Sequence, residues 1–191
     1  MRALVVFESM FGNTKLIAEA VAAGLAERME TELVEVGDAP AAIAGDVELL
    51  VVGGPTHVLG MSRPNTRRDA VHQAAVGAGA AAERPAASTD VGIREWLTTV
   101  DLGLLAPAVA VFDTRMRSPF AGSAAAKAAR LLRRRGVRVV GRRHFYVTGT
   151  RGPLRDAERA EARWWAEDLA ARHIADGAMA GGPAGRDGAS R

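Results

Sequence analysis

Residues 2–14 read Arg-Ala-Leu-Val-Val-Phe-Glu-Ser-Met-Phe-Gly-Asn-Thr, an apolar run followed by a short polar turn. The apolar run, which ends at Phe7, predicts a strand that is buried on both faces of a sheet. Beyond the turn, apolar residues recur at the i, i+4 and i+8 spacing of one helix face, at Ile17, Val21 and Leu25. A buried strand that leads through a turn into a helix is the opening unit of an α/β fold.

The same alternation of apolar runs and helical stripes continues along the chain. Further strands are expected at 31–36, 47–52, 107–112 and 137–147, the last with a break at Gly141. Helices are expected at 15–29, 66–75, 123–135 and 156–175, and from a cap at Ser88, Thr89 or Asp90 to Val100. Trp96, Trp164 and Trp165 are expected in the core or at its edge. Strands that alternate with helices form a parallel sheet. We therefore predict a doubly wound five-stranded sheet of order 2-1-3-4-5 with helices on both faces.

Composition and length narrow the class of protein. The chain has 191 residues, 48% of them hydrophobic, which is enough for one domain with a full core. It has no cysteine, which excludes disulfides, thiolate nucleophiles and cysteine-ligated metal centres. No apolar run approaches the roughly 18 residues of a membrane span, and the first run is too short for a signal peptide. We expect a cytoplasmic protein without a membrane span.

The domain is expected to cover residues 1–175. Within it, the low-complexity stretch 76–87, rich in alanine and glycine, predicts a mobile insertion over 76–92. The glycine- and alanine-rich end of the chain predicts a disordered tail over 176–191.

Charge is unevenly distributed along the chain. The first 50 residues contain 3 basic and 9 acidic residues, and the remaining ones contain 22 basic and 13 acidic residues. The arginines at 133–135, 138, 142 and 143 form either a solvated basic face or a patch for a polyanion. Because no aromatic platform for stacked bases accompanies them, we expect no nucleic-acid partner.

The turn after the first strand, residues 9–14, has the features of a phosphate-binding loop. It leads straight into a helix, whose first N–H groups and positive dipole end attract anions. Ser9 and Thr14 add hydroxyl groups. Asn13 is able to cap the helix or bind the ligand, and Gly12 allows a close backbone approach. The alternative is an ordinary capped strand–helix turn. The sequence contains none of four other site motifs: the triphosphatase P-loop, the three-glycine dinucleotide fingerprint, HExxH and GxSxG.

Two more strands end in specialised loops at the same predicted edge of the sheet. Residues 53–62, Gly-Gly-Pro-Thr-His-Val-Leu-Gly-Met-Ser, combine glycines with polar and apolar side chains. Residues 113–120, Asp-Thr-Arg-Met-Arg-Ser-Pro-Phe, follow the next strand. Such surfaces suit a planar ligand with hydrogen-bonding edges. In doubly wound sheets ligands bind beyond the carboxyl ends of the strands, at the switch point between strands 1 and 3.

These loops resemble the flavin-binding loops of flavodoxins. Residues 9–14 are similar to the flavodoxin phosphate loop in its S-M-[FY]-G-N-T form, and 53–56 with Gly60 resembles the second flavin loop. Asp113 resembles the aspartate that follows the fourth strand, and the order of elements is similar over residues 1–172. The resemblance implies a flavodoxin-like fold.

The resemblance also implies FMN as a non-covalent cofactor. The phosphate would lie on residues 9–14, and the isoalloxazine ring between the second and third loops. The residues implied as FMN contacts are Ser9, Met10, Phe11, Gly12, Asn13, Thr14, Pro55, Thr56, His57, Val58, Gly60, Met61, Asp113, Thr114 and Arg115.

The chain departs from flavodoxins at several positions. Phe11 stands where the usual phosphate loop has a third hydroxyl group, so one phosphate contact is lost or passes to a backbone N–H. Flavodoxins commonly sandwich the ring between aromatic side chains, but here the second loop offers only His57 and the third only Phe120. The chain also lacks the strong acidity of many flavodoxins. Ring contacts are then expected from His57, Val58, Leu59, Met61, Thr114 and Met116.

Three functions are consistent with these features. The first is an FMN-binding electron-transfer protein that serves a redox partner protein. The alternative is an FMN-dependent NAD(P)H:quinone-type oxidoreductase, which needs an open ring face. The third is a flavodoxin-like interaction module without flavin, against which the intact phosphate loop argues. We assign no catalytic residue and no metal ligand, because His57 suits a loop hydrogen bond and the histidines lack metal-site spacing.

Overall fold

The computed structural model describes residues 1–57, 60–68, 91–104, 106–118 and 122–180. Its strands are β1 (Arg2–Phe7), β2 (Glu30–Glu35), β3 (Val47–Pro55), β4 (Ala108–Met116) and β5 (Val139–Val147). Its helices are α1 (Asn13–Ala26), α3 (Ile93–Thr99), α4 (Ala124–Arg134) and α5 (Glu158–Ala180). A further short helical segment covers residues 64–68.

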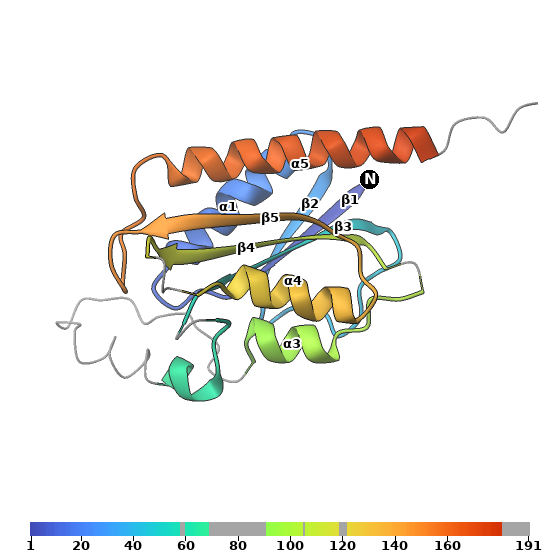
Figure 1. Cartoon of the computed structure of the whole chain (residues 1–191). Helices are drawn as coiled ribbons and strands as arrows, with labels where there is room; N and C mark the ends of the chain where they lie inside the picture. The colour runs from blue at the N-terminus through green and yellow to red at the C-terminus, as the bar shows by residue number, and fades with distance from the viewer. Residues whose placement is uncertain (58–59, 69–90, 105, 119–121, 181–191) are drawn as a thin grey trace, which may run out of the picture.

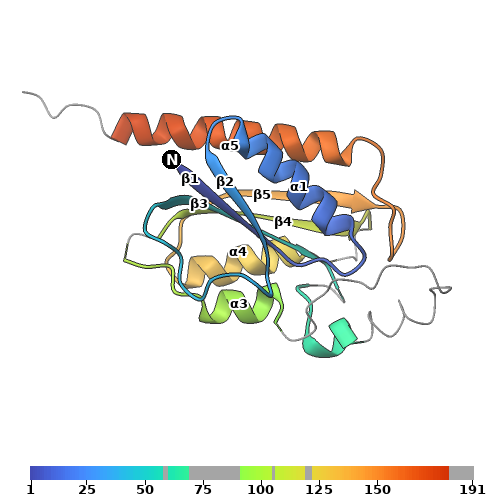
Figure 2. The same ribbon diagram turned by 180° about the vertical axis from the view of Figure 1, so that it is seen from behind.

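The strands form one five-stranded parallel sheet in the order β2-β1-β3-β4-β5, which confirms the predicted topology. Helices α1 and α5 cover one face of this sheet, and α3 and α4 cover the other (Figure 1 and Figure 2). Because all strands run in the same direction, the loops after β1, β3, β4 and β5 meet at one edge of the sheet, here called the carboxyl edge. This is the edge at which the sequence places the ligand loops.

Two hydrophobic cores explain why the strands read as continuous apolar runs. Along β1, Leu4 and Val6 belong to the core under α3 and α4, whereas Val5 and Phe7 belong to the core under α1 and α5. The central residues of β3 and β4 alternate between the two cores in the same way. Helices on both faces leave neither side of the sheet to water, so both sides need apolar residues.

Strands β3 and β4 are longer than the sequence predicts. Their pairing continues past the apolar runs, with Gly54 beside Asp113 and Pro55 beside Thr114. The predicted strands ended where glycine, proline and polar residues begin, a composition that indicates a loop. Gly53 keeps the sheet regular here, because a Cβ at this position would collide with the ring of Phe112.

The last strand and the last helix also differ from the prediction. β5 continues through Gly141 as one strand, but its pairing is irregular where the break was predicted: Val109 and Ala110 of β4 pair with Val139 and Gly141, which leaves Val140 as an extra residue in β5. Helix α5 runs past its predicted end at residue 175 to Ala180.

Helix α3 begins at an N-cap that the sequence did not suggest. The N-cap is Gly92. The predicted caps Ser88, Thr89 and Asp90 lie outside the described residues, as do residues 76–90 of the predicted insertion and 181–191 of the predicted tail.

The three tryptophans divide between core and surface. Trp96 is buried, and its indole N–H donates to the carbonyl of Pro40 at 2.9 Å. Trp165 packs edge-on against Phe112 and Phe145. The prediction of Trp164 as a core residue was wrong, since it is 65% exposed. Adjacent residues of a helix point in different directions, so only one of the neighbouring pair on α5 faces the sheet.

Candidate functional site

The loop between β1 and α1 presents unpaired backbone donors at the carboxyl edge. Gly12 adopts a left-handed conformation (φ 81°) that a side chain would strain, and α1 begins directly after it. The hydroxyl oxygen of Ser9 accepts a hydrogen bond from the N–H of Lys15 at 3.2 Å. Among the described residues, the backbone N–H groups from Phe11 to Thr14 have no acceptor. These donors, at the positive end of the α1 dipole, form an anion cradle.

Two side chains of this loop are engaged with other parts of the protein. The side-chain amide of Asn13 donates to the carbonyl of Arg151 at 3.0 Å, which ties the loop to the segment after β5. The hydroxyl groups of Thr14 and Thr114 are hydrogen-bonded at 2.7 Å, and both residues are buried. Their contacts therefore hold the loop against β4 and the β5 side of the edge.

The loop after β3 makes a tight turn above the end of β4. The N–H of Thr56 donates to the carbonyl of Thr114 at 2.9 Å, and His57 and Gly60 exchange two backbone hydrogen bonds of 2.7 and 2.9 Å. The buried Nε2 of His57 has no partner within the described part of the chain. Burial lowers the pKa of His57, so the imidazole is neutral at pH 7. Val58 and Leu59, which were also expected as ring contacts, lie outside the described residues.

The side chain of Asp113 organises the floor beneath this turn. Its carboxylate is fully buried and accepts hydrogen bonds from the hydroxyl groups of Thr56 and Ser123 at 3.0 and 2.7 Å. It also accepts from the N–H of Ala125 in the first turn of α4, at 2.9 Å, and its second oxygen lies 2.7 Å from Nδ1 of His144. The resemblance implied Asp113 as an FMN contact, but its oxygens face protein donors.

These donors decide the charge of Asp113. Burial alone acts to raise the pKa of this carboxyl, but the hydrogen bonds from His144, the Ala125 N–H and Ser123 outweigh it and hold the pKa below its ordinary value. Asp113 is therefore ionised at neutral pH and holds the loops after β3 and β4 together through the start of α4.

The loop after β4 contributes cationic and apolar side chains. Arg115 donates from Nη2 to the carbonyl of Ser118 at 2.9 Å, while its buried Nε has no partner among the described residues. Met116 is exposed at the end of the strand, and the guanidinium of Arg117 lies 5.9 Å from the ring centre of Tyr146 on β5. Phe120, the one aromatic side chain of this loop, lies outside the described residues.

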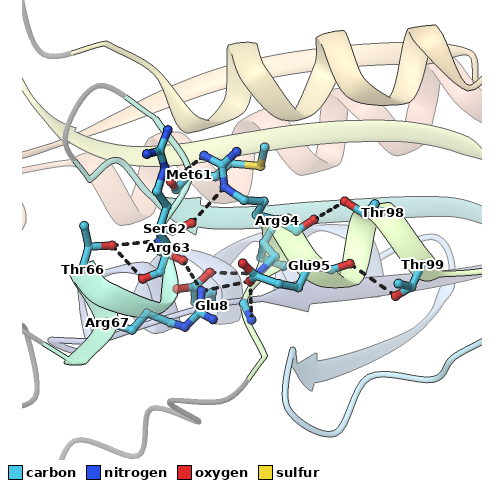
Figure 3. A network of polar contacts seen from close by, with 12 residues as sticks. Glu8, Met61, Ser62, Arg63, Thr66, Arg67, Arg94, Glu95, Thr98 and Thr99 are labelled. Atoms are coloured by element: carbon cyan, nitrogen blue, oxygen red, sulfur yellow. Dashed lines mark hydrogen bonds and ion pairs between the residues drawn. The ribbon is translucent and has the colours of Figure 1, made fainter.

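A second polar cluster joins β1 to α3 and to the segment after the β3 turn (Figure 3). Oε2 of Glu8 accepts the N–H of Ile93 at 2.9 Å, and the buried guanidinium of Arg67 donates to Ser62 at 3.1 Å and to Glu95 at 3.0 Å. Glu95 in turn accepts the N–H of Gly92 at 3.1 Å. The side chains of Glu8, Arg67 and Glu95 converge in Figure 3, and the contacts hold residues 61–67 against α3.

Glu8 lines a small cavity and has one oxygen without a hydrogen-bond partner among the described residues. Oε1 is buried and has no partner among the described residues. The cavity, of about 10 Å³, is the size of a single water molecule, and its lining includes Gly54, Pro55, Met61 and Ile93. Burial raises the pKa of Glu8, and the hydrogen bonds from Ser62 and the Ile93 N–H offset only part of this effect.

Comparison with known proteins identifies the architecture that carries these loops. The chain matches no family model and no curated protein. Among solved structures it is similar to a flavodoxin from the domain Archaea, at 21% identity and a TM-score of 0.57, over 91% of this chain and 99% of that one. It is also similar to oxidised flavodoxin 1 from Bacillus cereus, at 20% identity and a TM-score of 0.59, over 92% and 98% of the two chains. The chain has the flavodoxin-like fold.

In this flavodoxin-like fold, most of the expected site residues gather at the carboxyl edge. Within the described ranges no group of three or more His, Asp or Glu side chains is placed to hold a metal ion. In the same part of the chain no helix is both long and apolar enough to cross a membrane. The residues that the loops of β1, β3 and β4 bring to this edge are Ser9, Met10, Phe11, Gly12, Asn13, Thr14, Pro55, Thr56, His57, Gly60, Met61, Asp113, Thr114 and Arg115.

Sequence reasoning missed several residues that shape the carboxyl edge of this flavodoxin-like sheet. Ser123 was read only as the start of a helix, although a serine N-cap is also a donor to a nearby carboxylate. His144 lies in the middle of β5, and its contact with Asp113 depends on the pairing of β4 with β5. Glu8 carried one visible signal, since an acid that follows a buried strand directly is close to the core.

Proposed function

We propose that this protein binds FMN non-covalently at the carboxyl edge and transfers electrons between partner proteins. The observation that carries the proposal is the anion cradle: Gly12 in a left-handed conformation, followed by N–H groups from Phe11 to Thr14 that have no acceptor among the described residues. A phosphate group satisfies such donors without a cationic side chain. FMN, when bound, supplies a ring that accepts and releases electrons reversibly.

The remaining contacts would place the ring between the loops after β3 and β4. Pro55, Thr56, His57, Gly60 and Met61 form one side, and Thr114 and Arg115 the other. In this proposal Asp113 fixes the spacing of the two sides, and the expected contact Val58 lies outside the described residues. A neutral His57 offers the ring edge either a hydrogen-bond donor or an acceptor.

The second candidate is an FMN-dependent NAD(P)H:quinone-type oxidoreductase. It is favoured by the absence of Trp and Tyr from residues 53–62 and 113–120, which leaves a face of the ring open to a small substrate. Steady-state oxidation of NADH and NADPH with a quinone acceptor separates the candidates. Slow oxidation supports the electron carrier, and rapid oxidation supports the enzyme. Under both proposals the protein is located in the cytoplasm.

Substitution of Gly12 tests the cradle. A side chain at φ 81° strains the loop by about 1–2 kcal/mol, so Gly12→Ala is expected to weaken FMN binding about tenfold while riboflavin, which lacks the phosphate, binds as before. Binding is measured by quenching of flavin fluorescence with flavin-free protein. FMN, and not FAD, is expected when the cofactor of the purified protein is released by heat and identified by chromatography.

Gly136→Ala is the matched control. Gly136 has a similar φ of 78°, and like Gly12 it has open space where a Cβ would lie, but it is far from the cradle, in the turn after α4. Its substitution costs comparable backbone strain and leaves the affinity for both flavins unchanged. Equal weakening of FMN and riboflavin by Gly12→Ala, or failure to bind either flavin, would contradict the proposed site.

A further inference from the structure

The two loops that flank the proposed ring site are rich in cations, and their one acid, Asp113, is buried and hydrogen-bonded. Residues 54–68 and 114–127 include six basic residues and not one Asp or Glu. Arg67 is buried in the Glu8 cluster. The other five, here called the basic rim, are exposed or half-exposed: Arg63, Arg68, Arg115, Arg117 and Lys127.

Hydrogen bonds join the two loops that carry the basic rim. The N–H of Thr56 donates to Thr114 at 2.9 Å, and the N–H of Ala124 donates to the hydroxyl of Thr56 at 2.9 Å. Lys127 reaches over the turn after β3, since a Cβ on Gly60 would lie 2.6 Å from its Nζ. The positive charges thus border the same loops that would hold the ring.

Some other arginines on the surface of the protein are paired with acids. Arg2 pairs with Glu32 and Asp46 at 2.7 and 3.0 Å, and Arg163 with Glu27 at 2.6 Å. None of the basic rim forms an ion pair with an acid in the described part of the chain. Arg115 and Arg68 instead donate to the neutral oxygens of Ser118 and Asn65. Among the described residues, the five positive charges of the rim therefore have no acid as an ion-pair partner.

We propose that the basic rim docks the acidic surface of an electron-carrier protein, which brings the partner's redox centre to the flavin edge. The inference rests on the proposed FMN function and adds the chemistry of the partner. Charge of one sign around a cleft steers an oppositely charged protein and accelerates its association by factors of about 10 to 1000. Salt screens this attraction over roughly 10 Å at 0.1 M ionic strength. The complex is a transient one, because electron transfer requires release after each encounter.

The first experiment compares two carriers of opposite charge. The FMN-loaded chain receives one electron from a reduced plant-type [2Fe–2S] ferredoxin, an acidic carrier, and the reduced chain gives one electron to cytochrome c, a basic one. We expect the second-order rate with ferredoxin to fall as ionic strength rises from 10 to about 300 mM, and the rate with cytochrome c to rise. The same sign of salt dependence with both carriers would overturn the proposal.

The second experiment reverses two charges of the basic rim. Arg117→Glu/Lys127→Glu is expected to slow electron transfer from ferredoxin at least tenfold at low salt and to speed transfer to cytochrome c. Arg28→Glu/Arg134→Glu has the same change in net charge at exposed positions near the opposite edge of the sheet, and should alter either rate less than threefold. Equal effects of the two double variants would show that net charge acts without a docking surface, against the proposal.

Docking is also measured as binding alone, without electron transfer. This test of the docking surface therefore does not depend on whether the chain binds FMN. Calorimetric titration of ferredoxin into the flavin-free chain should give a low-salt affinity that the rim variant loses and the control keeps. If the chain binds no flavin but retains this behaviour, the proposed function fails and the docking surface stands. If rim charge reversal abolishes saturable NADPH oxidation and leaves ferredoxin unaffected, the rim binds a nucleotide and the proposal is wrong.

Discussion

Two buried carboxylates at the carboxyl edge face opposite electrostatic conditions. Asp113, on β4, accepts the N–H of Ala125 at the start of α4, and Glu8, just after β1, accepts the N–H of Ile93 at the start of α3. Both are almost inaccessible, with exposures of 0% and 3%. Asp113 also has Thr56, Ser123 and His144 as partners, whereas one oxygen of Glu8 has none among the described residues.

The difference teaches that the number of donors, and not depth, decides whether a buried carboxylate keeps its charge. Burial acts to raise both pKa values, yet the pKa of Asp113 lies below its ordinary value and that of Glu8 above it. Arg67 opposes the rise at Glu8, but its guanidinium is shared with Glu95, which adds a second negative charge nearby. Both carboxylate oxygens of Asp113 thus have hydrogen-bond donors, whereas one oxygen of Glu8 has none among the described residues.

The largest expected effect comes from removing Asp113. Asp113→Ala leaves two hydroxyl groups, the Ala125 N–H and His144 without their acceptor, which should lower the free energy of unfolding at pH 7 by about 3–5 kcal/mol. Urea denaturation of the flavin-free protein measures this. The loss should shrink at acidic pH, because a carboxyl with a lowered pKa stabilises above its ordinary pKa and less as pH falls through the folded-state value.

Asp46→Ala is the control for this variant. Asp46 accepts hydrogen bonds from Arg2, but the pair is exposed, so its removal should cost no more than about 1 kcal/mol. If Asp113→Ala lowers the free energy of unfolding as little as Asp46→Ala does, the four donors must form equivalent hydrogen bonds with water once Asp113 is removed.

A smaller effect is expected from crowding the Glu8 cluster. A Cβ at Gly92 would collide with Nη1 of Arg67 and approach Oε2 of Glu8 and the hydroxyl of Ser62 to 2.9 Å each. Gly92→Ala should therefore lower the free energy of unfolding by about 1–3 kcal/mol, as overpacking of a buried site does. Gly45→Ala is the control, because Gly45 has nothing within 4 Å of its Cβ position and should tolerate the change. If the two variants have equal free energies of unfolding, the Glu8 cluster is packed loosely enough to accommodate a Cβ at position 92, and the prediction is wrong.

The smallest effect has the opposite sign. At pH 8, Glu8→Gln should raise the free energy of unfolding by about 1.4 kcal/mol for each unit by which burial raises the pKa of Glu8. A carboxyl with a raised pKa stabilises below its ordinary value of 4.5, and this stability is lost as pH rises through the folded-state pKa. The variant and the parent should therefore converge near pH 4. If Glu8→Gln is destabilising at pH 8, the attraction between the Glu8 carboxylate and the charge of Arg67 outweighs burial, and the contrast with Asp113 disappears.

The fold was predictable because its signal is local and repeated. Apolar runs such as Val47–Val52 and stripes such as Ile17, Val21 and Leu25 indicate strands and helices before any long-range contact is known. The sheet order was confirmed on that basis. The prediction went wrong where tertiary pairing overrode composition, as in the polar extension of β4 through Asp113 and Thr114.

The candidate site was predictable as a set of loops but not as a set of contacts. The turn at residues 9–14 is readable because glycine and hydroxyl residues lie together in the sequence. The partners of Asp113 come from three separate segments, and His144 is 31 positions away. Arg67 gave no signal either, since a buried arginine is rare and the acids that surround it are contributed by β1 and α3. Such contacts follow from the register of the assembled sheet, which a local pattern does not contain.

The hydrogen bond from Asn13 to the carbonyl of Arg151 joins positions that are 138 residues apart. During synthesis Asn13 leaves the ribosome early, while its partner, and the helix α5 that packs against α1, are among the last parts to emerge. The nascent chain therefore displays the turn at residues 9–14 long before that turn acquires this support. A ribosome stalled before Arg151 would hold a chain in which Asn13 still lacks its partner.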